Sequence, residues 1–122
     1  MNNPGQPTSV NITSILDNSA NINWEQHNAL GRSGAEISRL YREENSGQQV
    51  ALIRCVPGAM AEKHVHTGHE TFVILEGDFQ DESGVFKKGD IVVYPPNSSH
   101  SWRSNTGAII LAVWGGRVTA SV

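Results

Sequence analysis

Closely spaced turn-forming clusters divide the chain into short runs of β-branched and aromatic residues. Glycine, asparagine and proline in such clusters favour turns, because they adopt or pre-set the backbone angles that turns need. Many short strands at close spacing predict an all-β sandwich or barrel, and 122 residues fit one domain. The predicted strands are Ser9–Leu16, Ala20–Glu25, Ala35–Arg42, Gln49–Val56, Glu62–His66, Thr71–Phe79, Gly84–Phe86, Asp90–Tyr94, His100–Arg103 and Ala108–Trp114.

The two ends of the chain differ from this pattern. Residues 1–9 are rich in Asn, Pro, Gly and Gln and predict a flexible tail, which leaves residues 10–118 for the folded domain. A helical turn at Ser14–Asn18 is the alternative to a strand there. The last four residues, TASV, are expected to be loose. The apolar run Ala108–Trp114 predicts a strand buried on both faces.

Composition excludes several classes of function. The formal net charge is −3 and the basic residues are scattered, which argues against a nucleic-acid partner. No apolar run approaches the roughly 20 residues that a membrane span needs. The N-terminus lacks the basic and apolar regions of a secretion signal, so we expect a cytoplasmic protein. The single cysteine excludes an intrachain disulfide framework.

Three of the five histidines lie in one segment of seven residues, HVHTGHE. His64 and His66 are two residues apart, so on a strand both imidazoles point to the same side, roughly 6–7 Å apart along the chain. Glu70 has the same parity and reaches the same point if the strand continues or bends at Thr67–Gly68. His69 has the opposite parity and is expected to be an exposed turn residue.

His100 is the fourth candidate ligand, because a hairpin-like return after the turn at residues 95–99 would bring it beside His64 and His66. Three imidazoles and one carboxylate suit a divalent transition metal. Fe(II) and Zn are the leading candidates, and Mn, Ni and Cu fit the same donors. A closed tetrahedral set would indicate a structural ion, whereas open coordination positions would indicate catalysis.

The spacing of these residues resembles the two motifs of the cupin superfamily. The first motif matches in the spacing of Gly58, His64, His66, Glu70 and Gly77. The second matches at Gly89, Pro95 and His100, with Asn97 in place of a glycine and Ser104 in place of an asparagine. Asparagine adopts the left-handed conformation that a turn glycine supplies. The change at Ser104 removes a polar residue that usually supports the turn.

Within the superfamily, residues 24–114 resemble the cupin-like domain of ChrR-type anti-sigma factors and the acetylacetone dioxygenases. The resemblance implies an RmlC-like double-stranded β-helix, a jelly-roll barrel with one ion inside. It carries over His64, His66, Glu70 and His100 as ligands. Three histidines bind iron in the dioxygenases, whereas the ChrR-type domain adds the glutamate, so Glu70 favours four ligands. The anti-sigma role does not transfer, because no cysteine pair is present for the zinc-binding domain.

Other residues have weaker signals. Cys55 is expected in the core. Arg54 has the opposite parity, and an inward Arg54 would bind a substrate anion or Glu76. We expect His27 on the surface, and the acidic run 78–82 in a solvated hairpin. The candidate pocket residues are Arg54, Phe72, Ile74, Tyr94 and Trp102, with Trp114 packed in the barrel.

The leading hypothesis is therefore an Fe(II)-type, dioxygenase-like enzyme acting on a small organic substrate, chelated through an enolate or carboxylate. The alternatives are a Zn-containing metal or stress sensor, a small-ligand binder, a non-redox lyase or isomerase, and a barrel that its metal only stabilises. An open sheet edge invites pairing, and two-fold symmetry is the commonest closure, so we expect a homodimer.

Overall fold

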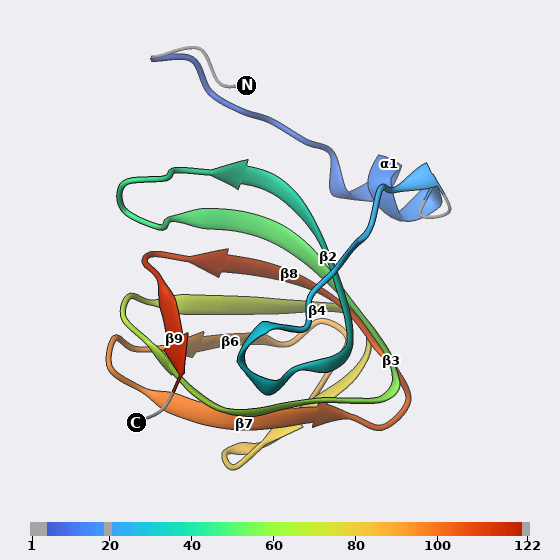
Figure 1. Ribbon diagram of the computed structural model, residues 1–122. Helices are drawn as coiled ribbons and strands as arrows, with labels where there is room; N and C mark the ends of the chain where they lie inside the picture. The colour runs from blue at the N-terminus through green and yellow to red at the C-terminus, as the bar shows by residue number, and fades with distance from the viewer. Residues whose placement is uncertain (1–4, 19–20, 121–122) are drawn as a thin grey trace.

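The computed structural model of the protein describes residues 5–18 and 21–120, and it is built almost wholly from strands (Figure 1). This confirms the predicted all-β jelly-roll barrel. The two helical elements are α1 (Ile12–Asp17) and the 3-10 turn η2 (Ala29–Gly31). The strands are β1 (Glu25–Gln26), β2 (Ser33–Arg42), β3 (Gln49–His66), β4 (Glu70–Asp81), β5 (Gly84–Lys87), β6 (Ile91–Tyr94), β7 (Ser99–Ser104), β8 (Ala108–Trp114) and β9 (Val118–Ala120).

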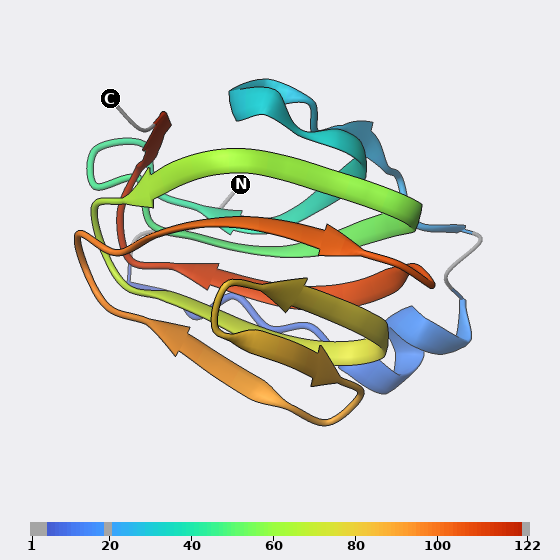
Figure 2. The same ribbon diagram turned by 90° about the horizontal axis from the view of Figure 1, so that it is seen from below.

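Two long strands, β3 and β4, run through both layers of the barrel. The first half of β3 pairs with β2 and β8, and the first part of β4 pairs with β8 and β6. The second half of β3 pairs with β7 and β9, whereas the last residues of β4 pair with β5 and β7. All of these pairings are antiparallel. The layer with β7 faces the viewer in Figure 2.

The corner between the layers lies at Pro57–Gly58. The sequence predicted two strands here, Gln49–Val56 and Glu62–His66, separated by a turn. The structure instead has one strand of 18 residues that bends, with Gly58 at φ 87°. Glycine adopts this angle without steric cost, so the chain changes layer while remaining extended.

Alternate residues of the strands fill the space between the layers. On β8, Ala108, Ile110, Ala112 and Trp114 are buried, whereas the residues between them are only partly covered. The prediction that both faces of β8 are fully buried was therefore wrong, because the outer face is only half covered. The core also contains Ala35, Ile37, Ala51, Ile53, Cys55, Ala59, Ala61, Phe72, Ile74, Phe79, Tyr94 and Trp102.

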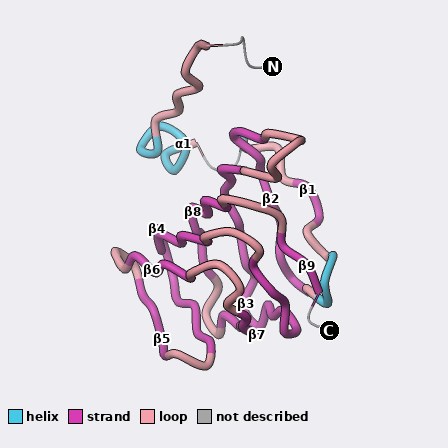
Figure 3. Tube along the Cα trace, turned by 90° about the vertical axis from the view of Figure 1, so that its left-hand side faces the viewer, coloured by secondary structure: helices cyan, strands magenta, loops and turns pink. Residues whose placement is uncertain are grey.

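The N-terminal segment lies outside the barrel (Figure 3). The predicted strand Ser9–Leu16 was wrong, since helix α1 occupies Ile12–Asp17 and the Asn11 side chain accepts a hydrogen bond from the Ser14 N–H at 2.9 Å. Asparagine is a favoured residue at such a helix start. Of the predicted strand Ala20–Glu25, residue 20 lies outside the described residues, and the described part is strand only at Glu25. No helix in the described parts of the chain is long and apolar enough to cross a membrane.

The C-terminal segment also differs from expectation. Val118–Ala120 forms β9, which pairs with the His64–His66 end of β3, so the expectation of a loose TASV end was wrong for residues 119–120. Residues 121–122 of that segment lie outside the described range. The β9 strand completes the layer beside the histidine pair.

Candidate metal centre

The four candidate ligands come from three strands in both layers. His64 and His66 lie at the end of β3, and His100 on β7 is the direct register partner of His64. Glu70 is the first residue of β4 in the opposite layer. The chain bends at Thr67–Gly68 between β3 and β4, so the bent alternative for Glu70 is the one observed. The strand β6 pairs with β4 rather than with β7, so His100 arrives by a crossing between layers and not by a hairpin.

These side chains converge on one buried point. Their exposed fractions are 1% for His64, His66 and Glu70 and 3% for His100, and one ligand atom from each lies within 4.8 Å of the others. Ligand atoms on a single ion, each about 2.1 Å from it, lie roughly 3–4 Å apart. The cluster therefore already has close to the spacing that one ion requires.

Each histidine is held through Nδ1, which leaves Nε2 for the centre. Nδ1 of His64 is 2.9 Å from the carbonyl oxygen of Glu62, and Nδ1 of His66 is 3.2 Å from Oγ of Ser98. Nδ1 of His100 is 3.0 Å from a carboxylate oxygen of Asp81. Such partners set the tautomer and the ring orientation of a metal-ligating histidine.

Three of the converging atoms have no hydrogen-bond partner of acceptable geometry: Nε2 of His66, Nε2 of His100 and Oε1 of Glu70. The carboxylate oxygen lies 2.9 Å from the first nitrogen and 3.4 Å from the second. Buried polar atoms are almost always paired, so three unpaired ones at the same point indicate a missing ligand. A divalent cation satisfies all three, and the donor set fits iron, zinc, manganese, nickel or copper.

Asp81 is a buried support that the sequence did not reveal. Its carboxylate contacts His100 and also accepts a hydrogen bond from the Tyr94 hydroxyl. Burial raises the pKa of Asp81, but these two hydrogen bonds outweigh it and lower the pKa below its usual range. The prediction of a solvated acidic hairpin at 78–82 was therefore wrong for Asp81, whose side chain is 0% exposed.

Glu70 is held by Trp114, whose indole N–H donates to Oε2. Burial opposes ionisation of Glu70, but the neighbouring imidazoles of His100 and His66 outweigh it and lower its pKa to about 2. The carboxylate is therefore anionic at neutral pH. Trp114 was predicted to line or pack the barrel, but nothing in the sequence indicated a hydrogen bond to Glu70, which lies 44 residues away.

The histidines divide into two electrostatic classes. Burial lowers the pKa of His64 to about 4, so its imidazole is neutral near pH 7 and able to donate a lone pair. Burial also acts to lower the pKa of His100, but the neighbouring Glu70 carboxylate and the contact with Asp81 raise it above the ordinary value. A cation at the centre would compete with a proton for Nε2 of His100.

The turn before β7 is tied to His66. The Asn97 N–H donates to the His66 carbonyl at 2.7 Å, and the His66 N–H donates to the Ser98 carbonyl at 3.0 Å. Asn97 has φ 67°, the left-handed conformation expected for it. Ser104 is fully buried and its hydroxyl donates to the Asp78 carbonyl at 2.6 Å, so a polar contact is kept where the motif usually has asparagine.

The candidate pocket residues separate into three groups. Tyr94 and Phe72 border the cluster, with ring centroids 4.4 and 6.4 Å from that of His100. Ile74 and Trp102 are buried in the general core. Arg54 does not face the interior: it pairs with Glu36 at 2.8 Å and its guanidinium lies 4.5 Å from the Trp24 ring centroid. Its strand neighbour Cys55 takes the inward position, so the alternative of an inward Arg54 is not the one observed.

Three further residues complete the comparison with the sequence. Cys55 is a buried thiol whose pKa is raised to about 12 by burial, as expected for a core residue. His69 is exposed. His27 was expected on the surface, but it is half-buried beside Trp114, with ring centroids 6.4 Å apart.

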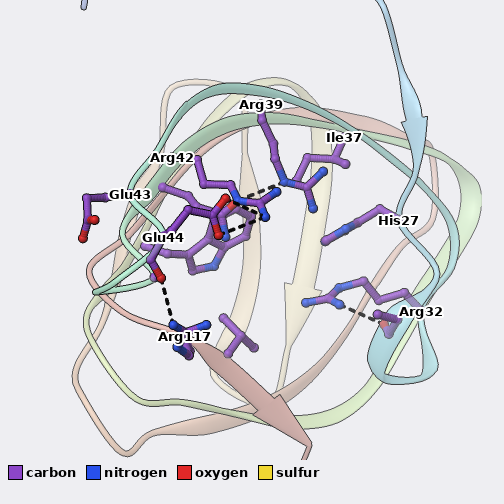
Figure 4. A pocket seen from close by; sticks show the side chains of 13 residues that line it. His27, Arg32, Ile37, Arg39, Arg42, Glu43, Glu44 and Arg117 are labelled. Carbon is purple, nitrogen blue, oxygen red and sulfur yellow. Dashed lines mark hydrogen bonds and ion pairs between the residues drawn. The ribbon is translucent and has the colours of Figure 1, made fainter. Parts of the chain in front are cut away.

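A cavity of about 400 Å³ lies next to the cluster (Figure 4). Trp114 lines this cavity and also holds Glu70, so its indole is the wall that the two sites share. The lining of a second cavity, of about 430 Å³, includes Asp81 and Glu82. Sequence reasoning missed the first cavity because its lining residues come from distant parts of the chain: His27, Ala29, Arg32, Ile37, Arg39, Arg42, Glu43, Glu44, Gly47, Gln49, Trp114, Arg117 and Val118.

Comparison with known families gives the same fold as the structure. The family model of the ChrR cupin-like domain matches residues 13–118. The chain belongs to this cupin family. No curated protein sequence matches it significantly.

Solved structures with the same fold include proteins of several activities. A candidate acetylacetone dioxygenase from Methylibium petroleiphilum PM1 is 14% identical with a TM-score of 0.80, over 100% of this cupin and 85% of that chain. A chain of the Rhodobacter sphaeroides complex of SigE with the anti-sigma ChrR is 22% identical with a TM-score of 0.64, over 82% of this cupin but only 49% of that chain. A predicted oxalate decarboxylase from Thermotoga maritima is 29% identical with a TM-score of 0.64. The match covers 84% of this cupin and 96% of that chain.

Proposed function

We propose that this cupin is a metal-dependent enzyme that acts on a small organic substrate in the manner of a dioxygenase. The observation that carries the proposal is the convergence of His64, His66, Glu70 and His100 on one buried point, with three unpaired polar atoms. When bound there, Fe(II) supplies a Lewis acid and a site for O2. The likeness to an acetylacetone dioxygenase supports this reaction class.

The chain's own residues would orient the ligands and keep the centre dry. Asp81 and Ser98 hold two imidazoles by Nδ1, and Trp114 holds the carboxylate. Phe72 and Tyr94 cover the cluster with aromatic rings. A site that excludes water strengthens electrostatic interactions with a bound substrate.

The test is elemental analysis of protein purified without added chelator or metal, beside His64→Ala and His100→Ala variants. We expect near-stoichiometric iron in the wild type and its loss in both variants. His69→Ala is the matched control, because His69 belongs to the same segment but is exposed. Oxygen consumption is then measured with small β-diketones and organic acids.

Each result decides one part of the proposal. If the protein contains iron but consumes no oxygen with any tested substrate, the dioxygenase hypothesis is contradicted. Stoichiometric zinc would move the assignment to a non-redox enzyme or a sensor. Absence of metal, with no uptake on reconstitution, would refute the metal centre itself.

Two alternatives have specific support. A four-ligand site in a ChrR-like domain favours a metal or stress sensor that binds zinc and turns over no substrate. The likeness to a predicted oxalate decarboxylase favours a non-redox lyase. Turnover of an organic acid without oxygen would support the lyase. Metal-dependent binding of a protein partner without turnover would support the sensor.

Cytoplasmic location remains a prediction.

We also propose a homodimer. Large apolar side chains of β5 and β6 are exposed, at 55% for Val85, 67% for Ile91 and 57% for Val93. Such a surface beside short strands suits pairing with a second copy. Light scattering on the eluting protein should give twice the chain mass, and Ile91→Lys should shift it toward one chain mass. A wild-type monomer would overturn the proposal.

A further inference from the structure

The cavity beside the cluster is unusually rich in arginine. Four arginines line it (Arg32, Arg39, Arg42 and Arg117), and two glutamates, Glu43 and Glu44, accompany them. Its volume of about 400 Å³ lies within the range of sites for small organic molecules. The second cavity differs, because only one arginine, Arg103, lines it together with Glu82.

Two of the four arginines already have carboxylate partners. Arg39 pairs with Glu25 at 3.2 Å, and Arg42 pairs with Glu44 at 3.0 Å. Arg117 is exposed and donates to the backbone carbonyl of Glu44 at 2.8 Å. Each of these three arginines therefore already has a partner within the protein.

Arg32 is the exception, because it is buried and has no such partner. It is 9% exposed, and its one hydrogen bond among the described residues runs from Nη1 to the Ala29 carbonyl at 2.8 Å. No carboxylate of the described residues lies within ion-pair distance of it. A guanidinium has five N–H donors, and a buried charge is costly unless it is paired and hydrogen-bonded.

His27 adds an unpaired polar atom beside Arg32. Its Nε2 is buried and has no hydrogen-bond partner. Figure 4 shows His27 and Arg32 extending from the same side toward the middle of the cavity. A buried guanidinium without a carboxylate partner and an unpaired imidazole nitrogen facing one space fit a polar, anionic ligand between them.

The cavity also shares a wall with the metal centre. Trp114 lines the cavity and donates a hydrogen bond to Glu70. We propose that the cavity binds a small organic acid, with Arg32 pairing with the carboxylate and His27 contacting it, so that the acid is held next to the metal centre. The assignment of this acid as substrate rests on the proposed function, whereas its binding by Arg32 does not.

Charge distinguishes a carboxylate from a phosphate here. One buried guanidinium without a partner matches one negative charge, and a planar fork of N–H donors matches a carboxylate. Glu43 and Glu44 on the opposite wall disfavour a more highly charged anion. The ligand that fits this cavity is therefore a monocarboxylate.

The experiment is isothermal titration calorimetry with pyruvate and 2-oxobutanoate, each beside its neutral amide, and with inorganic phosphate. Protein as purified and protein stripped of metal are both titrated. Arg32→Met removes the charge, and Arg54→Met is the matched control, since Arg54 is paired with Glu36 on the outer face. Metal content and thermal unfolding are measured on every variant.

We expect both acids to bind with and without metal, the amides to bind at least tenfold more weakly, and Arg54→Met to match the wild type. Arg32→Met should lose at least tenfold in affinity. The inference would be overturned if the wild type bound acid and amide equally well. It would also be overturned if phosphate bound more tightly than the acids, or if neither acid bound. The amide comparison needs no variant, so it decides the matter even if Arg32→Met fails to fold.

The two proposals fail in different ways. If the protein never takes up metal but still binds the acids through Arg32, the carboxylate site stands and the metal-dependent enzyme is refuted. Protein that binds the acids only when metal is present, regardless of Arg32, would refute the carboxylate site and leave the metal enzyme standing.

Discussion

At the scale of single residues, the centre depends on supports that are remote in the chain. Asp81 holds His100 across 19 positions, and Trp114 holds Glu70 across 44. The ligands themselves follow from local spacing, because alternate residues of a strand share a face. Their supports follow from strand pairing, which no local pattern records.

Asp81→Asn should weaken metal binding by 10–100-fold while the fold is kept. Asparagine retains the size of the side chain but loses the charge that orients His100, and outer-shell carboxylates of this kind have effects of about that size. Competition against a chelator of known affinity measures the change. Glu82→Gln is the control, since Glu82 is the exposed neighbour. Equal affinities for Asp81→Asn and the wild type would contradict the assigned role.

His27 should make the protein acid-sensitive. Burial lowers its pKa to about 3 from the ordinary 6.5. The unfolded chain therefore takes up a proton at His27 below pH 6.5, whereas the folded protein does so only near pH 3. Stability due to the neutral form is present above pH 6.5 and is lost as the pH falls toward 3.

His27→Gln should accordingly give a flatter dependence of the unfolding free energy on pH between 6.5 and 4. Urea unfolding at several pH values measures this slope. His69→Gln, a change at an exposed residue, should keep the wild-type slope. A His27→Gln slope as steep as that of the wild type would show that other groups cause the acid sensitivity.

At the scale of elements, the decisive feature is that β3 and β4 each serve both layers. The pattern of residues predicted the strands, but it placed a break at Pro57–Gly58 where the chain only turns a corner. It also mistook the first helix for a strand, because Ser9–Leu16 has β-branched residues at strand spacing. Pairing with other strands decided the first case, whereas the helix buries no residue and has a local cap at Asn11.

Gly77 should be essential at the crossing of β4 into the second layer. It has φ +78°, and a Cβ there would collide with the Gly107 carbonyl oxygen. Gly77→Ala should therefore destabilise the fold by more than about 2 kcal/mol, from backbone strain and the collision together. Gly89→Ala is the matched control, because Gly89 has φ +93° but open space around it. Chemical denaturation measures both, and equal losses would show that the collision contributes nothing.

At the scale of the whole molecule, metal binding and folding should be linked. The four ligands come from β3, β4 and β7, so an ion at their centre joins both layers of the barrel. A ligand that binds only the folded state at 100 times its Kd adds about 2.7 kcal/mol of stability.

Stripping the metal should therefore lower Tm by roughly 10 °C for a domain of this size. Calorimetry of protein as purified, stripped and reloaded measures the shift. His100→Ala should abolish the difference between loaded and stripped protein, whereas His69→Ala should keep it. Identical melting with and without metal would mean that the ion does not bridge the layers.

The sequence by itself determined the all-β class, the cupin motifs and the four candidate ligands, because these depend on the period of a strand and on spacing along the chain. Only the tertiary structure decided the burial of Asp81 and His27, the outward position of Arg54 and the arginine-rich cavity beside Trp114. Those features arise where residues from different strands meet. Which strands meet depends on the register and layer crossing of the whole barrel, and spacing within any one segment does not specify them.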